Sequence, residues 1–125
     1  MIQSYNDLNV YKRSYDIALK LYKFARTLPE DERFGLTSQI KRAATSIPLN
    51  IAEGYGKKSS EQEFKRFLIM AQGSCNEMMV LLRFSYDLGF MNKESHEIFA
   101  SEYDEIVRMI NSMISKWQTF KKSNI

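Results

Sequence analysis

The residue types that most often do chemistry in proteins are scarce in this chain of 125 residues, which has one histidine and one cysteine. The residue three before His96 is Lys93, so the Glu-x-x-His ligand pair of di-iron bundles is absent and no metal site is expected. Cys75 falls on an apolar helical seam, where a thiol behaves as a small hydrophobic side chain. No catalytic residue and no cofactor is therefore predicted, and an enzyme is the least favoured class of function.

Two glutamates lie at or beside apolar helical positions. Glu53 lies at the end of the second predicted helix, and Glu77 directly precedes Met78 on the third. An inward carboxylate needs a basic partner, and Arg42 and Arg83 are the candidates. We interpret these residues as structural ion pairs that fix the register of the helices, with acid–base catalysis as the alternative.

Lysine and arginine recur as adjacent pairs, which are Lys12-Arg13, Lys41-Arg42, Lys57-Lys58, Lys65-Arg66 and Lys121-Lys122. The third and fourth pairs flank the turn between the second and third predicted helices, and we expect them to form one patch at one end of the molecule. Acidic residues cluster elsewhere, at Glu30–Glu32 and Glu102–Glu105. This separation of charge is typical of a surface that binds a polyanion. The alternative is that the basic side chains only keep the protein soluble.

The elements that must position these residues are predicted to be helices within a single all-α domain, residues 1–125. Apolar periodicity and capping residues predict four of them, over Asp7–Thr27, Gly35–Gly56, Ser60–Leu88 and Asn92–Lys121. Short connections between long helices favour an antiparallel up-down-up-down four-helix bundle. Pro48 predicts a kink in the second helix, because proline lacks the amide that would bond to the carbonyl of Ala44.

Apolar residues recur at steps of three and four, as in helices that interlock with their neighbours. These seams are Leu8, Tyr11, Tyr15, Ala18, Tyr22 and Ala25; Phe64, Leu68, Ala71, Cys75, Met78 and Leu82; and Phe99, Tyr103, Ile106, Ile110, Met113, Trp117 and Phe120. A second apolar set lies off the seams and comprises Ile17, Leu21, Phe24, Leu28, Phe67, Met70, Leu81, Met109 and Ile114. Because a bundle helix needs only one buried stripe, this surplus predicts a homo-oligomer in which another copy covers a second face. The alternative is a wide stripe in a monomeric core.

One stretch is long and specific, and it reads GLTSQIKRAATSIPLNIAEGYG from residue 35 to residue 56. With the aromatic-rich first helix and the Phe64, Arg66-Phe67-Leu68 and Gly73-Ser74 positions, it resembles the four-helix-bundle proteins encoded in intervening sequences of bacterial 23S ribosomal RNA genes. The resemblance implies an antiparallel bundle that assembles into a cyclic oligomer, typically a homopentamer. The chain is also similar to the accessory variability proteins of diversity-generating retroelements, which present a basic surface to nucleic acid and to a reverse transcriptase.

These observations together predict a non-catalytic, homo-oligomeric protein that binds structured RNA or DNA with little sequence specificity. The expected phosphate contacts are Arg42, Lys57, Lys58, Lys65 and Arg66, with Lys41 and Lys12-Arg13 as outer contributors. The competing hypothesis is an oligomeric scaffold that docks a protein partner and does not bind nucleic acid. The lone cysteine suits a reducing compartment, and the chain shows neither a secretory signal nor an apolar run long enough to span a membrane. A cytoplasmic location is therefore expected.

Overall fold

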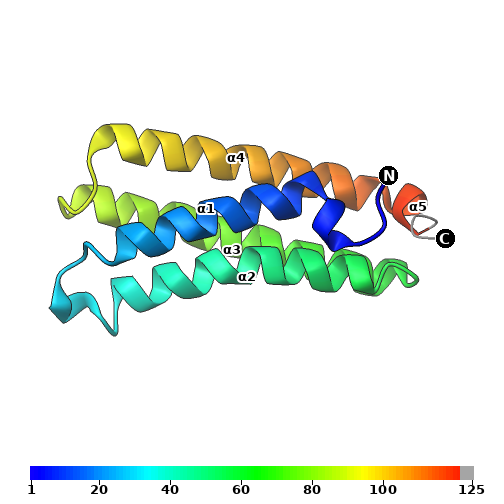
Figure 1. The fold of residues 1–125 in the computed structure, drawn as a ribbon, viewed down its shortest axis with the longest axis horizontal. Coiled ribbons are helices and arrows are strands. Elements are labelled where there is room, and N and C mark those ends of the chain that lie inside the picture. Colours follow the sequence, from blue (N-terminus) through cyan, green and yellow to red (C-terminus); the bar gives the residue numbers. More distant parts are fainter. Residues whose placement is uncertain (122–125) are drawn as a thin grey trace.

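The computed structural model describes residues 1–121 and is all-helical, with no strand in that part of the chain, so the predicted all-α class is confirmed. Four long helices lie alongside one another in Figure 1, and the chain reverses direction at each connection between them. In chain order the elements are η1 (Tyr5–Asp7), α1 (Asn9–Ala25), η2 (Glu30–Glu32), α2 (Leu36–Gly56), α3 (Glu61–Asp87), α4 (Lys93–Ser115) and α5 (Trp117–Phe120). The predicted single domain includes residues 122–125, among them Lys122, which lie outside the described residues.

Local sequence fixes most of the helix ends. Ser60 and Asn92 cap α3 and α4, because each side-chain oxygen accepts a backbone N–H of the first helical turn, at 3.3 and 2.7 Å. Gly89, the predicted stop of α3, has a φ of +83°, a left-handed conformation that glycine adopts without strain. The first helix begins at Asn9 rather than at Asp7, because Asp7 instead belongs to the preceding 3-10 turn.

The core is built from the predicted seams of α3 and α4. All six seam residues of α3 are fully buried. The α4 seam is buried through its middle and half-buried at its ends, where Phe99, Trp117 and Phe120 lie. From α2 the core takes the apolar stripe that was read from the sequence, which comprises Leu36, Ile40, Ala43, Ala44, Ile47 and Ile51. The helix α2 continues through Pro48 and ends at Gly56.

The first helix departs from the predicted seam. Its buried residues are Val10, Ser14, Ile17, Ala18, Leu21 and Ala25. Of the predicted tyrosines, Tyr15 is 47% exposed, and Tyr11 and Tyr22 are half-buried at the edge of the helix. The seam prediction was therefore wrong for the three tyrosines, whereas Leu8, Ala18 and Ala25 are buried as predicted. The physical reason is that an aliphatic stripe is buried without polar groups to satisfy, whereas a buried tyrosine hydroxyl needs a hydrogen-bond partner.

Most of the second apolar set belongs to the protein's own core. The prediction that another copy of the chain covers these residues is therefore corrected. The members that are buried are Ile17, Leu21, Leu28 and Leu81; Phe24, Met109 and Ile114 are half-buried against the core, and Phe67 is half-buried. Met70 alone in this set is exposed, at 45%. A wide stripe therefore explains most of the surplus. Different apolar residues are exposed instead, and they include Leu19 of α1, Leu49 of α2, Ile69, Val80 and Phe84 of α3, and Ile98 of α4.

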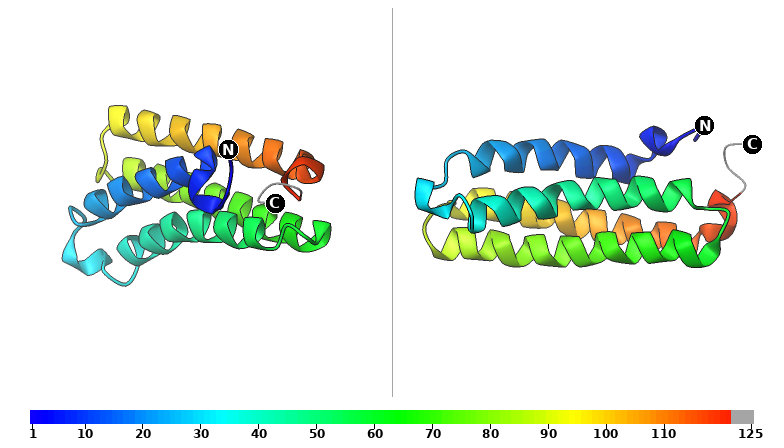
Figure 2. Two further views of the ribbon diagram at one scale, coloured as in Figure 1. Left: turned by 45° about the vertical axis from the view of Figure 1, so that its right-hand side comes forward. Right: turned by 90° about the horizontal axis from the view of Figure 1, so that it is seen from below.

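The predicted fourth helix is interrupted near its end. It stops at Ser115, and the four-residue α5 follows after Lys116. The indole Nε1 of Trp117 donates a hydrogen bond to the carbonyl oxygen of Lys58 at 2.8 Å, so α5 is held against the turn between α2 and α3. The two further views show α5 at the same end of the molecule as that turn (Figure 2). No helix within residues 1–121 combines the length and the apolar character that a membrane-spanning segment needs.

Candidate nucleic-acid interface

Basic side chains and aromatic rings lie together at the turn between α2 and α3. The Lys57 Nζ atom lies 5.9 Å from the centre of the Phe67 ring, and the guanidinium carbon of Arg66 lies 4.4 Å from it. Both basic side chains are exposed, while the ring is half-buried. The two cations therefore share one aromatic ring and are held near each other although they come from different elements.

The short α5 adds a third basic segment to this end. Its hydrogen bond to the Lys58 carbonyl places Trp117 at the turn, and the Lys121 Nζ atom lies 4.7 Å from the centre of the indole ring. The ammonium of Lys58 lies 4.8 Å from the ring centre of Tyr55. We call Lys57, Lys58, Lys65, Arg66 and Lys121 the turn patch. The sequence had indicated Lys121 only as part of a basic pair, because the break before α5 leaves no strong signal in the apolar pattern.

Two members of the turn patch already have acidic partners on their own helix. The Lys65 Nζ atom lies 2.7 Å from a carboxylate oxygen of Glu61, and Arg66 donates two hydrogen bonds to Glu63 at 3.0 and 3.2 Å. Hydrogen bonding to Arg66 holds the pKa of Glu63 below its ordinary value. These pairs are exposed and screened by water, so a phosphate group can compete for the same cations.

Lys41 and Arg42 lie apart from the turn patch, although the sequence had grouped them with it. They are about 15 residues before Lys57 on the same helix, which corresponds to roughly 22 Å along the axis. Arg42 Nη2 lies 3.3 Å from Glu77 Oε2 on α3, and Lys41 Nζ lies 5.4 Å from the centre of the Tyr22 ring on α1. These two residues therefore face different neighbours and do not extend the patch.

The four residues considered as structural ion pairs are all exposed. Arg42 and Glu77 contact each other, as described above. Arg83 instead contacts Asp87 one turn later on its own helix, with 3.0 Å between Nε and Oδ2. Glu53 has no ion-pair partner among residues 1–121. The sequence had placed these glutamates on an inward face. In the structure both carboxylates are exposed to water, so neither needs a basic partner to offset a cost of burial.

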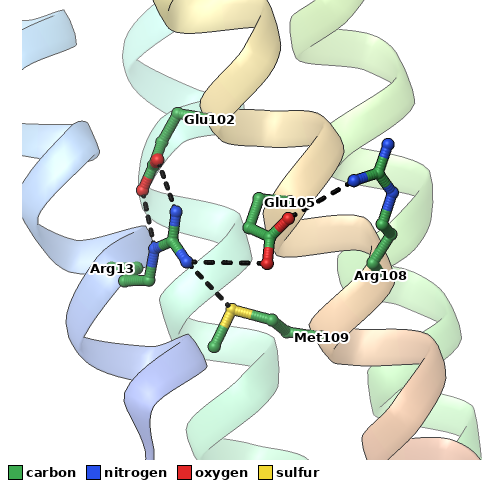
Figure 3. Close-up of polar contacts among 5 residues, drawn as sticks. All are labelled: Arg13, Glu102, Glu105, Arg108 and Met109. Atoms are coloured by element: carbon green, nitrogen blue, oxygen red, sulfur yellow. Dashed lines mark hydrogen bonds and ion pairs between the residues drawn. The ribbon is translucent and has the colours of Figure 1, made fainter.

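A second ion pair between helices involves Arg13, which the sequence had assigned to the phosphate-binding surface. Its guanidinium donates hydrogen bonds to both carboxylate oxygens of Glu102 on α4, at 2.7 and 3.0 Å (Figure 3). A second carboxylate, that of Glu105, lies 3.8 Å away, and the Met109 sulfur accepts a hydrogen bond at 3.6 Å. Arg13 lowers the pKa of Glu102 through this hydrogen bond. The residue therefore ties α1 to α4 and is not available to a ligand.

The residue types with reactive side chains lie elsewhere. Burial raises the pKa of the Cys75 thiol to about 12, and the thiol is fully enclosed by the core. The imidazole of His96 stacks on Tyr86, with 5.2 Å between ring centres. Within residues 1–121 no group of three or more His, Cys, Asp and Glu side chains converges as metal ligands do. What the surface offers is ammonium and guanidinium groups beside aromatic rings, which bind anions and bases.

Comparison with known proteins places this arrangement in context. The profile of the family described as 23S rRNA-intervening sequence protein matches residues 6–112. A crystal structure from Bacteroides thetaiotaomicron, of a protein with unknown function from the S23 ribosomal protein family, superposes with a TM-score of 0.77 at 25% sequence identity. The match covers 85% of this chain and 95% of that chain. No curated protein matches the sequence significantly.

Proposed function

This chain belongs to the 23S rRNA-intervening sequence protein family, and we propose that it is a non-catalytic, homo-oligomeric protein that binds structured RNA or DNA through the turn patch. The observation that supports this most directly is the gathering of basic groups from the turn, α3 and α5 around aromatic rings. Arginine and lysine neutralise phosphates, and such contacts supply most of the affinity in binding that is not sequence-specific.

The patch favours backbone contacts over base reading. Its members are long, flexible side chains at the end of the molecule, and such side chains reach phosphate groups without being fixed against base edges. Sequence specificity is therefore weak in this proposal. Arg66 is the strongest expected contact, because a guanidinium can donate two parallel hydrogen bonds to a phosphate group.

A homo-oligomer, a ring of five subunits by family resemblance, would repeat the turn patch around an axis. Oligomerisation is supported by an apolar row on the outer surface of α3, in which Ile69, Val80 and Phe84 are 56%, 56% and 55% exposed. Exposed apolar rows of this kind mark interaction surfaces. With a net charge of only +3 per chain, repetition of the patch is what would create a strong field. Light scattering at micromolar concentration tests the assembly, and a monomer would contradict it.

A second candidate function is an interaction scaffold in a cytoplasmic complex, with a protein partner such as a reverse transcriptase and no nucleic-acid binding. It is favoured by the pairing of Lys65 and Arg66 with Glu61 and Glu63, which offsets two of the charges in the turn patch. The two functions differ in their response to salt. Phosphate binding weakens steeply as salt rises, whereas apolar docking hardly changes.

Fluorescence anisotropy with a structured RNA and a DNA duplex, at roughly 50 and 200 mM salt, tests the proposal. A variant neutralises three members of the turn patch, and a control removes the same charge at remote exposed positions: K57Q/K65Q/R66Q against K23Q/R83Q/K93Q. For three lost duplex contacts the slope of log affinity against log salt should flatten by about 2–3. The control should keep the wild-type slope. Equal slopes for the two variants would refute the role of the patch, and absence of binding by the wild type would favour the scaffold.

A further inference from the structure

A second surface, between α1 and α2, has a composition that the turn patch does not explain. A groove of about 390 Å³ runs between these helices. Four of the chain's seven tyrosines line it, namely Tyr5, Tyr11, Tyr15 and Tyr22. We call it the tyrosine groove. Leu19 and Leu49 also line it and are 51% and 63% exposed, so the groove is open to solvent at these residues.

Three of the tyrosine rings form an aromatic cluster at one end of the groove. Tyr5 meets Tyr11 edge to face, with 4.9 Å between ring centres, and Tyr11 lies beside Tyr15 at 6.0 Å. Tyr5 and Tyr15 are 38% and 47% exposed, so their faces are accessible. Tyr22 lies two turns further along α1. From Tyr11 to Tyr22 the helix rises about 16 Å, which is the length of four to five stacked nucleotides.

Cations stand near the aromatic cluster and near Tyr22. Lys41 Nζ lies 5.4 Å from the centre of the Tyr22 ring. Lys12 lines an adjoining hollow together with Tyr11, Tyr15 and Asp16. Backbone hydrogen bonds chiefly, and the charge of Lys12 in addition, lower the pKa of the nearby Asp7. One ammonium group lies beside the half-buried Tyr22 ring and another beside the hollow that Tyr15 lines, and this charge favours an anionic, aromatic occupant over a purely apolar one. This combination of a basic rim with stacking rings is how proteins hold single-stranded nucleic acid.

We propose that the tyrosine groove binds unpaired bases of single-stranded RNA or DNA, with Tyr15 as the principal stacking residue and Lys12 and Lys41 on the adjacent phosphates. The inference rests on the proposed nucleic-acid binding and names its substrate class. The turn patch holds the phosphates of a duplex stem, and the groove takes the splayed bases of a loop or an end, which is where proteins usually read RNA. Stacking tolerates any base, so this site adds preference for single strands without adding sequence specificity.

The test compares two probes on four proteins. The probes are an oligothymidine of about 12 nucleotides and a duplex of the same length. The proteins are the wild type, Tyr15→Ala, Tyr15→Phe and a control, Phe34→Ala, which removes a ring that is 84% exposed outside the groove. Tyr15→Ala should weaken single-strand binding roughly fivefold or more, and duplex binding less than twofold. Tyr15→Phe and Phe34→Ala should bind both probes as the wild type does.

Each other outcome overturns the inference in a recognisable way. If Tyr15→Ala binds oligothymidine as tightly as the wild type, while the charge-neutralised turn patch still weakens binding, the groove is not a base site and the proposed function stands. If the wild type binds neither probe, both proposals fail. If Tyr15→Ala reduces the mass measured by light scattering, the groove is covered by a second copy of the chain and is not free to take a nucleic acid.

Discussion

Exchange of glycine for alanine should have opposite effects on the stability of this protein at two helical positions, Gly54 of α2 and Gly73 of α3. A β-carbon built at Gly54 lies 3.2 Å from the carbonyl oxygen of Phe64, 3.3 Å from Phe67 Cβ and 3.4 Å from Leu68 Cγ. A β-carbon built at Gly73 meets nothing within 4 Å. The first glycine is buried against α3 and the second is exposed. The pair therefore separates the packing of a methyl group from its effect on helix propensity.

The magnitudes follow from those contacts. Alanine gains about 0.5–1 kcal/mol over glycine inside a helix, and at Gly73 nothing opposes this gain. At Gly54 the three close atoms all belong to α3, and one is a backbone oxygen, so α3 must move as a body to admit a methyl group. Overpacking of this kind costs about 1–3 kcal/mol and exceeds the gain. We expect Gly54→Ala to lose about 1–2 kcal/mol and Gly73→Ala to gain up to about 1 kcal/mol.

Urea denaturation and thermal melting followed by circular dichroism measure both variants, at one protein concentration because assembly would otherwise shift the transition. For a chain of 125 residues each kcal/mol corresponds to about 4 °C in Tm. The two variants should therefore melt on opposite sides of the wild type. Equal stabilisation by both substitutions would refute the close approach of α2 and α3 at Gly54.

Three further predictions follow from the core and from the ion pair between α1 and α4. Leu68→Ala should lower the free energy of unfolding by about 2–5 kcal/mol, because this fully buried side chain leaves a cavity; urea denaturation measures the loss, and a loss under about 1 kcal/mol would contradict the packing. Cys75 should resist a thiol reagent at about pH 8 until the protein unfolds, since burial raises its pKa to about 12; rapid labelling of the native protein would show that the thiol is accessible. Glu102→Gln should destabilise the protein at neutral pH. Arg13 lowers the pKa of Glu102, so the pair stabilises the fold above the ordinary glutamate pKa of about 4.3, and that contribution is lost as the pH falls through the lower folded pKa. The difference in stability between Glu102→Gln and wild type should therefore shrink in acid, and a constant difference down to about pH 3 would argue against the pair.

The helices that form the centre of the core were the most predictable from sequence. In α3 the six residues of the predicted seam are all fully buried, although other apolar residues of this helix are exposed. In α1 two adjacent stripes fit the same spacing, one aliphatic and one rich in tyrosine. Periodicity alone does not choose between them, because both repeat at steps of three and four. The neighbouring helices made the choice by burying Ile17 and Leu21 completely and leaving Tyr15 at the rim.

The sequence indicated that the candidate site is basic, but it did not indicate correctly which basic residues lie together in it. The basic pairs beside the turn were visible because Lys57 and Arg66 are close in sequence to the glycine and serine that end one helix and begin the next. Arg13 belonged to an equally basic pair, but it faces α4 and meets Glu102 across a separation of 89 residues. No local pattern encodes such a partner. Lys121 reached the turn only because the indole of Trp117 binds a backbone carbonyl there.

The sequence by itself determined the helical class, the approximate bounds of the long helices, the family and the scarcity of reactive side chains. Each of these depends on local spacing, capping residues and composition, which a single chain displays in order. Only the tertiary structure decided which stripe of α1 is buried, which cations lie together and where aromatic rings stay exposed. Those features depend on the rotation of each helix against its neighbours. That rotation is set by the joint packing of side chains distant in the sequence, so no single segment contains it.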